Sequence, residues 1–318
     1  MLSSGCTAAI NLVAYAWGDE HVGPGDELIV TALEHHSNLL PWQRLCERRQ
    51  ARLRVVPLTS AGEIDLERLE VALSARTRLV AVTHVSNVTG GESPLREIVA
   101  LCRRVGARVL VDGAQAVPRL PVDVRALGCD FYAFAGHKTY GPSGIGALYA
   151  SRPSLRRMAP FLTGGGMVES VEAERSSYAA APARFEAGTP NLEGAIGLEC
   201  AIAYLTALGL DAVRAHDEEL TRYARAALAR VPGVRLIGEP GRPIGVVSFV
   251  LDDVHAHDVS TIVDEAGVAL RAGHHCASLA LQHFGVAATL RASFAVYNTR
   301  ADVDALVLAL ARVRQVFG

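Results

Sequence analysis

The sequence predicts an α/β protein built around a mainly parallel sheet, and three observations support that prediction. Over about the first 150 residues, short apolar runs typical of strands alternate with helical patterns of roughly 10–13 residues. Such alternation indicates βαβ units with right-handed crossovers. A chain of 318 residues also exceeds the usual size of one core, so we expect a second, smaller lobe. Finally, polar residues follow several of the predicted strands, which is where ligands of parallel sheets bind.

The composition is typical of an ordinary soluble enzyme. Half of the residues are apolar, and 31 Lys and Arg against 33 Asp and Glu give a net charge of -2. No basic run favours nucleic acid or an anionic membrane surface as a partner. The N-terminus lacks a secretory pattern, and the apolar stretch 304–317 is short and interrupted by arginine, so we expect no membrane span.

Six cysteines are scattered along the chain without CxxC pairs. In a chain of this length, that spacing favours reduced thiols and a cytoplasmic protein over a disulfide framework. It also predicts no zinc site or other metal site.

The elements of the first lobe follow from local patterns. In residues 8–17, Ile10, Val13 and Trp17 lie on one helical face. Strands and helices then alternate, with predicted strands at 26–33, 52–58, 77–86, 107–112, 129–134 and 145–150, and helices after Pro41 and at 64–73 and 94–106. The last of these helices has Pro94 in its first turn and Gly106 as its stop.

The second half of the chain predicts loops and then another lobe. Residues 151–192 are glycine-rich and irregular, as expected of loops over a site. Two long helices, at 196–210 and 211–231, are followed by strands at 234–238 and 245–251, a helix after His257 and a final helix. We therefore place a large cofactor-binding domain at 1–205 and a small C-terminal domain at 206–318.

Five chemically capable residues fall at the carboxyl ends of the predicted strands: His35, Asn87, Asp112, Gln115 and Lys138. An amine just past a buried strand can enter a cleft, lose its water and become nucleophilic. A Schiff base to pyridoxal phosphate is the obvious use of such a lysine, and a solvated turn lysine is the alternative.

Pyridoxal phosphate needs a lysine for its aldehyde, a carboxylate for its pyridine nitrogen, a flat partner for its ring and a helix N-terminus for its phosphate. Asp112 can serve the nitrogen, although a hydrogen-bonded cap would explain it equally well. Gln115 could reach the ring oxygen and His35 could stack on the ring. Thr7, ahead of the first helix, and His137 could hold the phosphate.

Eight motifs make the family recognisable. They are, in chain order, SSGCTAAINLVA, EHHSNLLPWQ, THVSNVTGG, VDGAQAV, DFYAFAGHKTYGPSGIG, RFEAGTPN, RAGHHCA and RASFAVYNT. Together they closely resemble the cysteine desulfurases of the class V aminotransferase family, most of all the SufS-type branch with its selenocysteine lyase and cysteine sulfinate desulfinase relatives. The resemblance covers essentially the whole chain and implies the PLP-dependent transferase fold type I.

The resemblance also implies a role for each matching residue. Cofactor roles fall to the Schiff-base lysine Lys138, the pyridinium partner Asp112, the ring-oxygen partner Gln115, the stacking His35, and the phosphate ligands Thr7 and His137. Thr189 matches a phosphate contact that the family supplies from the other subunit, which implies a homodimer. Asn87, Arg271 and Arg291 are the expected substrate-binding residues, Arg291 because a planar guanidinium can grip a carboxylate in a fork.

Cys276 matches the cysteine that accepts sulfur. Its own context supports a nucleophile, because a glycine-bearing turn places an arginine and two histidines beside it and so favours the thiolate. Judged from the residues alone, a metal ligand or an inert buried thiol remain alternatives.

The implied reaction converts L-cysteine to L-alanine and leaves a persulfide on Cys276. Lys138, assisted by His35, moves the α-proton, and a SufE- or SufU-like acceptor takes the sulfur for iron–sulfur cluster assembly. The alternatives are a selenocysteine lyase, a sulfinate desulfinase, a general aminotransferase, or a truncated and inactive dimerisation module.

The sequence departs from the family pattern in three places. Ala135 stands where a serine hydroxyl commonly meets the phosphate, and Cys6 stands where a second threonine is common. In addition, family chains normally begin well before the SSGCT motif. We therefore expect a truncated or mis-started form, or another arrangement that covers the exposed surface.

Overall fold

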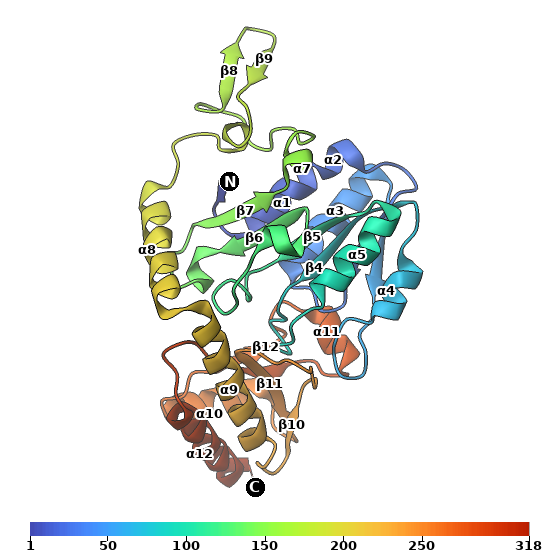
Figure 1. Cartoon of the computed structure of the whole chain (residues 1–318). Helices are drawn as coiled ribbons and strands as arrows, with labels where there is room; N and C mark the ends of the chain where they lie inside the picture. Colours follow the sequence, from blue (N-terminus) through green and yellow to red (C-terminus); the bar gives the residue numbers. More distant parts are fainter. Residues whose placement is uncertain (318) are drawn as a thin grey trace.

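A seven-stranded sheet forms the centre of the larger lobe (Figure 1). The computed structural model describes residues 1–317, and the strand order is β1-β7-β6-β5-β4-β2-β3. The strands are β1 (Leu2–Ser3), β2 (Glu27–Thr31), β3 (Arg52–Val56), β4 (Thr77–Thr83), β5 (Arg108–Asp112), β6 (Phe131–Ala135) and β7 (Gly146–Ala150). Strands β2 to β6 are parallel; β7 pairs antiparallel with β6, and the edge strand β1 pairs antiparallel with β7. The predicted fold class, α/β with a mainly parallel sheet, is confirmed.

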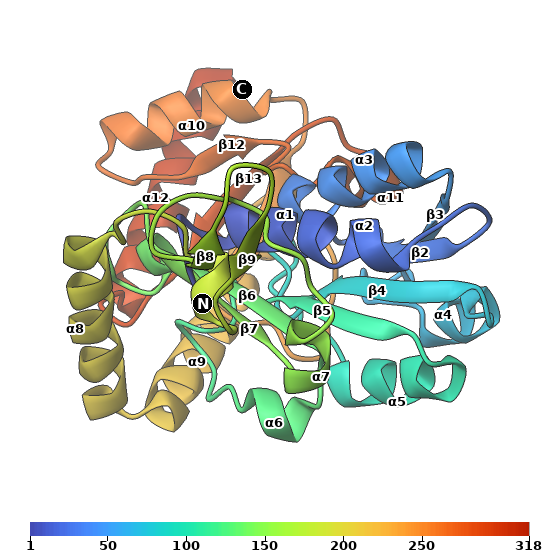
Figure 2. The same ribbon diagram turned by 90° about the horizontal axis from the view of Figure 1, so that it is seen from above.

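Helices cover both faces of this sheet (Figure 2). One face packs against α1 (Cys6–Ala16), α2 (Gly18–His21) and α3 (Leu40–Arg49), and the other against α4 (Leu66–Ala72), α5 (Leu95–Val105) and α6 (Val124–Leu127). Strand β4 shows why the strands read as continuous apolar runs. Its Leu79 and Ala81 enter the first core, and Val80 and Val82 enter the second.

The smaller lobe is built on a four-stranded antiparallel sheet in the order β10-β11-β13-β12. Its strands are β10 (Val234–Leu236), β11 (Val246–Leu251), β12 (Arg271–Gly273) and β13 (Thr289–Ser293). The helices that follow the linker are α9 (Leu210–Leu228), α10 (Ala256–Glu265), α11 (Ser278–His283) and α12 (Arg300–Phe317). Side chains from α9, α10 and α12 share one core with this sheet.

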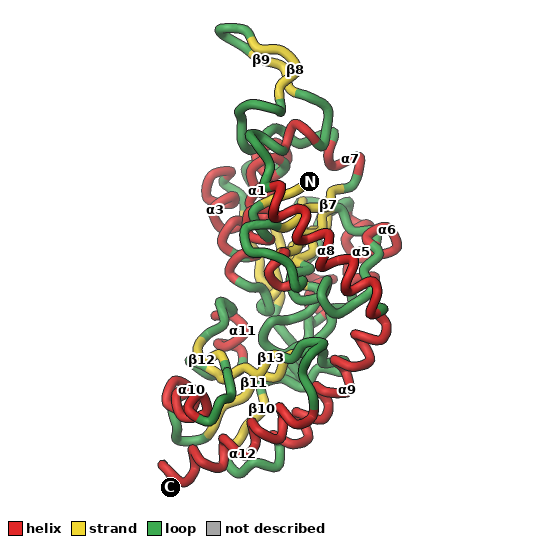
Figure 3. Tube along the Cα trace, turned by 90° about the vertical axis from the view of Figure 1, so that its left-hand side faces the viewer, coloured by secondary structure: helices red, strands yellow, loops and turns green. Residues whose placement is uncertain are grey.

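Two consecutive helices, α8 (Leu192–Leu208) and α9, link the lobes (Figure 3). Helix α8 lies along the large lobe, and α9 continues to the small lobe after a bend of 77°. The bend lies close to the predicted domain boundary at residue 205, which itself stays a prediction. Between residues 1 and 317, no single helix is long and apolar enough to cross a membrane, and only the bent α8–α9 pair passes by length and composition.

The segment between the lobes contains more structure than the predicted loops. After α7 (Arg152–Leu155), the strands β8 (Val168–Val171) and β9 (Ser176–Tyr178) form a hairpin that projects from the body (Figure 1). Three short 3-10 turns complete the fold: η1 (His36–Asn38), η2 (Gly136–Lys138) and η3 (Ala183–Phe185). Strands β12 and β13 and helix α11 were not predicted, although the two strands carry residues of the site.

Candidate active site

A cavity of about 590 Å³ opens at the carboxyl edge of the large sheet, where the two lobes meet. Every residue predicted for the site lines this cavity except Thr189. The large lobe contributes the start of α1, the turn η1, the end of β5 and the turn η2, and the small lobe contributes β12, β13 and the turn before α11. Residues spread over most of the chain therefore converge on one cavity, as the resemblance implied.

Lys138 is the only lysine in the chain, against 30 arginines. It ends η2, directly after the buried strand β6, and it lines the cavity. A covalent bond between a cofactor aldehyde and a lysine can therefore form at one position only. The count can be read from the sequence alone, and it marks Lys138 more strongly than its place after a strand does.

Asp112 ends β5 and is 6% exposed. Its Oδ1 accepts hydrogen bonds from the backbone N–H of Ala114 at 2.9 Å and from the thiol of Cys6 at 3.2 Å. Burial and the neighbouring Asp112 raise the pKa of Cys6 well above its usual value, so Cys6 stays a thiol donor. The residue that departs from the family pattern thus acts as a positioning partner of the carboxylate.

The imidazole of His35 is held in a neutral form. Burial, followed by the charge of Lys138, lowers its pKa to about 4. Its Nδ1 accepts a hydrogen bond from the backbone N–H of Ser37 at 3.1 Å. At neutral pH, His35 therefore presents an uncharged ring to the cavity, with its proton on Nε2.

The start of α1 offers a cradle for an anion. Its N-cap, Gly5, has a φ of 141° and provides no side-chain cap, so the first amides of the helix face the cavity without an intrahelical partner. The hydroxyl of Thr7 lies 2.7 Å from that of Ser37. A helix N-terminus with two hydroxyls beside it is suited to a phosphate group.

Two arginines of the small lobe lie directly opposite each other. Arg271 on β12 pairs with Arg291 on β13 in the antiparallel register, and both line the cavity. Burial, followed by the charge of Arg271, lowers the pKa of Arg291 to about 10. Like charges in this position destabilise a sheet, and an anionic ligand between them would offset that cost. The pair is well suited to a substrate carboxylate.

Cys276 lies on a turn with an unusual backbone. Both His275 and Cys276 have positive φ values, of 51° and 55°. His275 is 4% exposed, its Nε2 lies 2.8 Å from the hydroxyl of Thr289, and burial, followed by Arg291, lowers its pKa to about 4. His275 is therefore neutral at pH 7 and cannot favour a thiolate through a positive charge, contrary to the expectation for both neighbouring histidines.

Thr189 is exposed and lies outside the cavity of its own chain. Its expected contact with the cofactor of a second subunit stays a prediction. Sequence reasoning did not find Glu34, a fully buried residue next to His35. Its carboxylate accepts hydrogen bonds from Thr31, Asn38 and the backbone N–H of Thr83.

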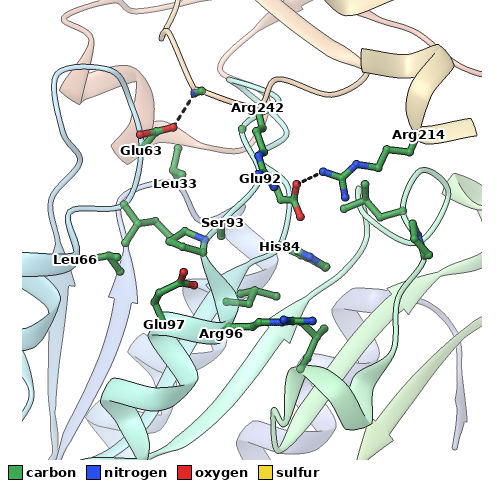
Figure 4. A pocket seen from close by; sticks show the side chains of 18 of the residues that line it. Leu33, Glu63, Leu66, His84, Glu92, Ser93, Arg96, Glu97, Arg214 and Arg242 are labelled. Atoms are coloured by element: carbon green, nitrogen blue, oxygen red, sulfur yellow. Dashed lines mark hydrogen bonds and ion pairs between the residues drawn. The ribbon is translucent and has the colours of Figure 1, made fainter. Parts of the chain in front are cut away.

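A second cavity, of about 820 Å³, lies beside α4 and α5 (Figure 4). One ion pair lies within it, between Glu92 and Arg214 at 2.8 Å, and Glu63 accepts a hydrogen bond from the backbone N–H of Gly241. None of the residues predicted for the cofactor lines it. The chemistry predicted from the sequence therefore belongs to the smaller cavity.

The chain is similar to known proteins over its whole length. Residues 1–306 match the family described as Aminotransferase class-V. A cysteine desulfurase of Salmonella agona (strain SL483) is 50% identical over 315 residues, which make up 99% of this chain and 77% of that protein.

Solved structures show the same relationship. The cysteine desulfurase CsdA from Escherichia coli superposes with a TM-score of 0.96 at 40% identity, over 99% of this chain and 79% of that chain. A variant of the protein C-DES with glycine covalently linked to its PLP cofactor superposes with a TM-score of 0.86 at 25% identity, over 98% of this chain and 80% of that chain.

Proposed function

The chain belongs to the class-V aminotransferases and is a pyridoxal-phosphate-dependent cysteine desulfurase, and we propose that it passes the sulfur of L-cysteine to Cys276 as a persulfide. One observation carries this proposal. Cys276, on the small lobe, lines the same cavity as the single lysine and the buried carboxylate Asp112. An amine, a carboxylate and a thiol therefore lie around one space of cofactor size.

The residues present fit pyridoxal phosphate. Lys138 supplies the amine, Asp112 the buried carboxylate, His35 a flat neutral ring and the start of α1 an anion cradle with Thr7. Gln115 and His137 line the same space. When bound, the cofactor supplies an electron sink for the α-carbon of the substrate.

The side chains around the cavity bind the substrate, move protons and position the sulfur-accepting turn. Arg271 and Arg291 hold the substrate carboxylate in a fork. The amine of Lys138 carries the α-proton, and the uncharged ring of His35, which has its proton on Nε2, can donate a hydrogen bond in the same space. Asn87 is 6% exposed and donates from its Nδ2 to the carbonyl oxygen of His275 at 2.8 Å, so it fixes the sulfur-accepting turn as well as lining the substrate space.

The sulfur step is a displacement at sulfur. The thiolate of Cys276 attacks the sulfur of cysteine, a sulfur–sulfur bond forms, and the bond between that sulfur and the β-carbon breaks. The bonding electrons stay with the carbon, which gains a proton and leaves as alanine. One thiol and one cysteine thus give one persulfide and one alanine, without an external oxidant.

The test uses purified protein loaded with pyridoxal phosphate and supplied with L-cysteine. We expect alanine and a persulfide on Cys276, both lost in Lys138→Ala. Cys276→Ala should keep the visible absorbance of the bound cofactor and form no persulfide. Borohydride reduction followed by peptide mapping should find the cofactor on Lys138. Normal sulfur transfer by Cys276→Ala would contradict the assigned role.

Substrate choice follows from the same turn. Because Cys276 lies in the cavity, a thiol nucleophile is available, and we propose L-cysteine as the preferred substrate over selenocysteine and cysteine sulfinate. Comparing turnover of the three substrates in wild type and Cys276→Ala tests this. Turnover that is fastest on selenocysteine or sulfinate and independent of Cys276 would favour the lyase or desulfinase.

We propose that the persulfide passes to a SufE- or SufU-like acceptor protein for iron–sulfur cluster assembly. Cys276 is partly exposed, which gives an acceptor thiol access to it. All six cysteines are free thiols in the structure, which supports a reducing compartment such as the cytoplasm.

We further propose a homodimer in which Thr189 reaches the cofactor phosphate of the partner. Exposed apolar side chains along α8, including Leu192, Ile196 and Tyr204 at 57%, 62% and 53%, support an interface on this helix.

Complementation between subunits tests the dimer. Lys138→Ala removes the amine of its own site, and Thr189→Glu places a carboxylate beside the partner's phosphate, so each homodimer should be inactive or weak. When the two variants are co-expressed, each mixed dimer contains one unaltered site and one that carries both substitutions. Its activity should therefore reach up to about half that of a wild-type dimer. Activity no higher than the sum of the separate variants would contradict the dimer arrangement.

A further inference from the structure

We propose that His36 is a positioning residue that holds the Cys276 turn against the large lobe. This inference rests on the proposed function, because it concerns the step in which Cys276 receives sulfur. His36 lies on η1, one residue after the His35 ring that lines the cavity. It would therefore link the cofactor side of the site to the sulfur-accepting side.

The Cys276 turn needs external support. His275 and Cys276 are consecutive non-glycine residues in the left-handed region, a conformation that side chains disfavour. Within the turn, the backbone N–H of Ala277 donates to the carbonyl oxygen of His274 at 2.9 Å, and the N–H of Cys276 donates to Nδ1 of His274 at 3.0 Å. Such strain persists only where the surroundings over-determine it.

The large lobe provides that support through two backbone carbonyls of the turn. The backbone N–H of His36 donates to the carbonyl oxygen of Cys276 at 2.7 Å, and Nδ2 of Asn87 donates to that of His275 at 2.8 Å. The side chain of His36 makes a third contact: its Nε2 lies 3.0 Å from the hydroxyl of Ser278, the first residue of α11. His36 thus contacts the chain on both sides of Ala277.

The turn η1 is itself held in place by buried hydrogen bonds. Asn38, which ends η1, donates to the buried carboxylate of Glu34 and accepts from the indole N–H of Trp42 at 3.1 Å. Glu34 in turn accepts from the backbone of Thr83, at the end of β4. A shift of the Cys276 turn would therefore have to break the contacts of His36 or strain this buried network.

The test compares His36→Ala and Ser278→Ala with wild type, both as holoenzyme. We expect the rate of persulfide formation on Cys276 to fall roughly threefold to tenfold in each, the range for losing one hydrogen bond. The double variant should be no worse than His36→Ala alone, because both substitutions remove the same hydrogen bond. Cofactor absorbance and KM for cysteine should not change.

Two further variants sharpen the comparison. His36→Gln keeps an amide that can donate to Ser278 and should restore most of the rate. His257→Ala removes an exposed histidine on α10, outside the cavity, and should behave as wild type. An unchanged persulfide rate in His36→Ala, or a loss explained by lost cofactor, would overturn the inference.

Alkylation of Cys276 by iodoacetamide, followed by peptide mapping without any substrate, separates this inference from the proposed function. A severalfold faster reaction in His36→Ala and Ser278→Ala supports the positioning role even where wild type forms no persulfide. Equal alkylation rates in all variants overturn it. Absence of persulfide in wild type counts against the proposed function alone.

Discussion

Asp112 is buried, and its carboxylate charge therefore needs a cation in the cavity. It is 6% exposed, and a buried carboxylate is costly unless it is paired and hydrogen-bonded. The N–H of Ala114 and the thiol of Cys6 both contact Oδ1. A protonated pyridine nitrogen would supply the missing partner, so the charge of this one residue controls how well the cofactor binds.

Asp112→Asn tests the charge with little effect on packing, because an amide oxygen can still accept from Ala114 and Cys6. We expect pyridoxal phosphate to bind about tenfold to a hundredfold more weakly, the range for losing a charge-assisted hydrogen bond, and alanine production to fall at least as much. Titration of the visible absorbance with cofactor measures the first quantity. Unchanged affinity would show that Asp112 is an ordinary cap.

At the scale of the element, η1 depends on the carboxylate of Glu34. Burial raises its pKa to about 8, against the opposing effect of the hydrogen bonds from Thr31, Asn38 and Thr83. A folded-state pKa above the unfolded value means that the folded protein binds more protons between about pH 4.5 and 8. This residue's contribution to stability is therefore full below about pH 4.5 and is lost as the pH rises towards 8.

Glu34→Gln should remove that pH dependence. We expect the free energy of unfolding of wild type to decline between about pH 5 and 8 by a contribution on the order of 1 kcal/mol or more, and Glu34→Gln to lack this contribution. Urea unfolding at several pH values provides the comparison. Parallel pH profiles of the two proteins would show that Glu34 does not titrate in this range.

Elements with strong local patterns could be predicted from the sequence, and those set by tertiary contacts could not. Strand β4 and helix α5 carry their own periodicity and boundary residues, and both were predicted within a few residues. Strands β12 and β13 hold only 3 and 5 residues, with arginines directed to the site, so their pattern is too short and too polar to read. The β8–β9 hairpin is wholly exposed, so no buried face gives its strands an alternating pattern.

The same distinction between local patterns and tertiary contacts applies to the residues of the candidate site. Lys138, Asp112 and Cys276 were predicted because resemblance and strand ends mark them. Glu34 and His36 could not be assigned roles, because their partners Thr83 and Ser278 lie far away in the sequence. The charge state of His275 likewise depends on its burial against Thr289, which no local pattern reveals.

At the scale of the whole molecule, a buried ion pair connects the two lobes. Nε of Arg119, after β5, lies 3.6 Å from a carboxylate oxygen of Asp217 on α9, with side chains 8% and 1% exposed. Arg119 also donates to the carbonyl oxygen of Phe294, just after β13, at 3.1 Å. Because the cavity takes residues from both lobes, this contact helps to set its width.

Arg119→Met should lower the free energy of unfolding by about 3–5 kcal/mol, because it leaves the carboxylate of Asp217 buried without a cation. Arg119→Met combined with Asp217→Leu should recover much of that loss. Arg175→Ala breaks an exposed pair with Glu172 and serves as a control with little effect. Urea unfolding measures all three, and a double variant as unstable as the single one would contradict the expectation.

The single lysine has a practical consequence for following occupancy of the cavity. An endoproteinase that cuts only after lysine has one target bond in the whole polypeptide, between Lys138 and Thr139. Thr139 is 1% exposed, so this bond is cut only after unfolding. Once borohydride has fixed a bound coenzyme on the amine of Lys138, the modified lysine is no longer a target. Digestion under denaturing conditions would then split unloaded molecules into two fragments and leave loaded ones whole, which gives a gel-based count of filled sites that needs neither colour nor turnover.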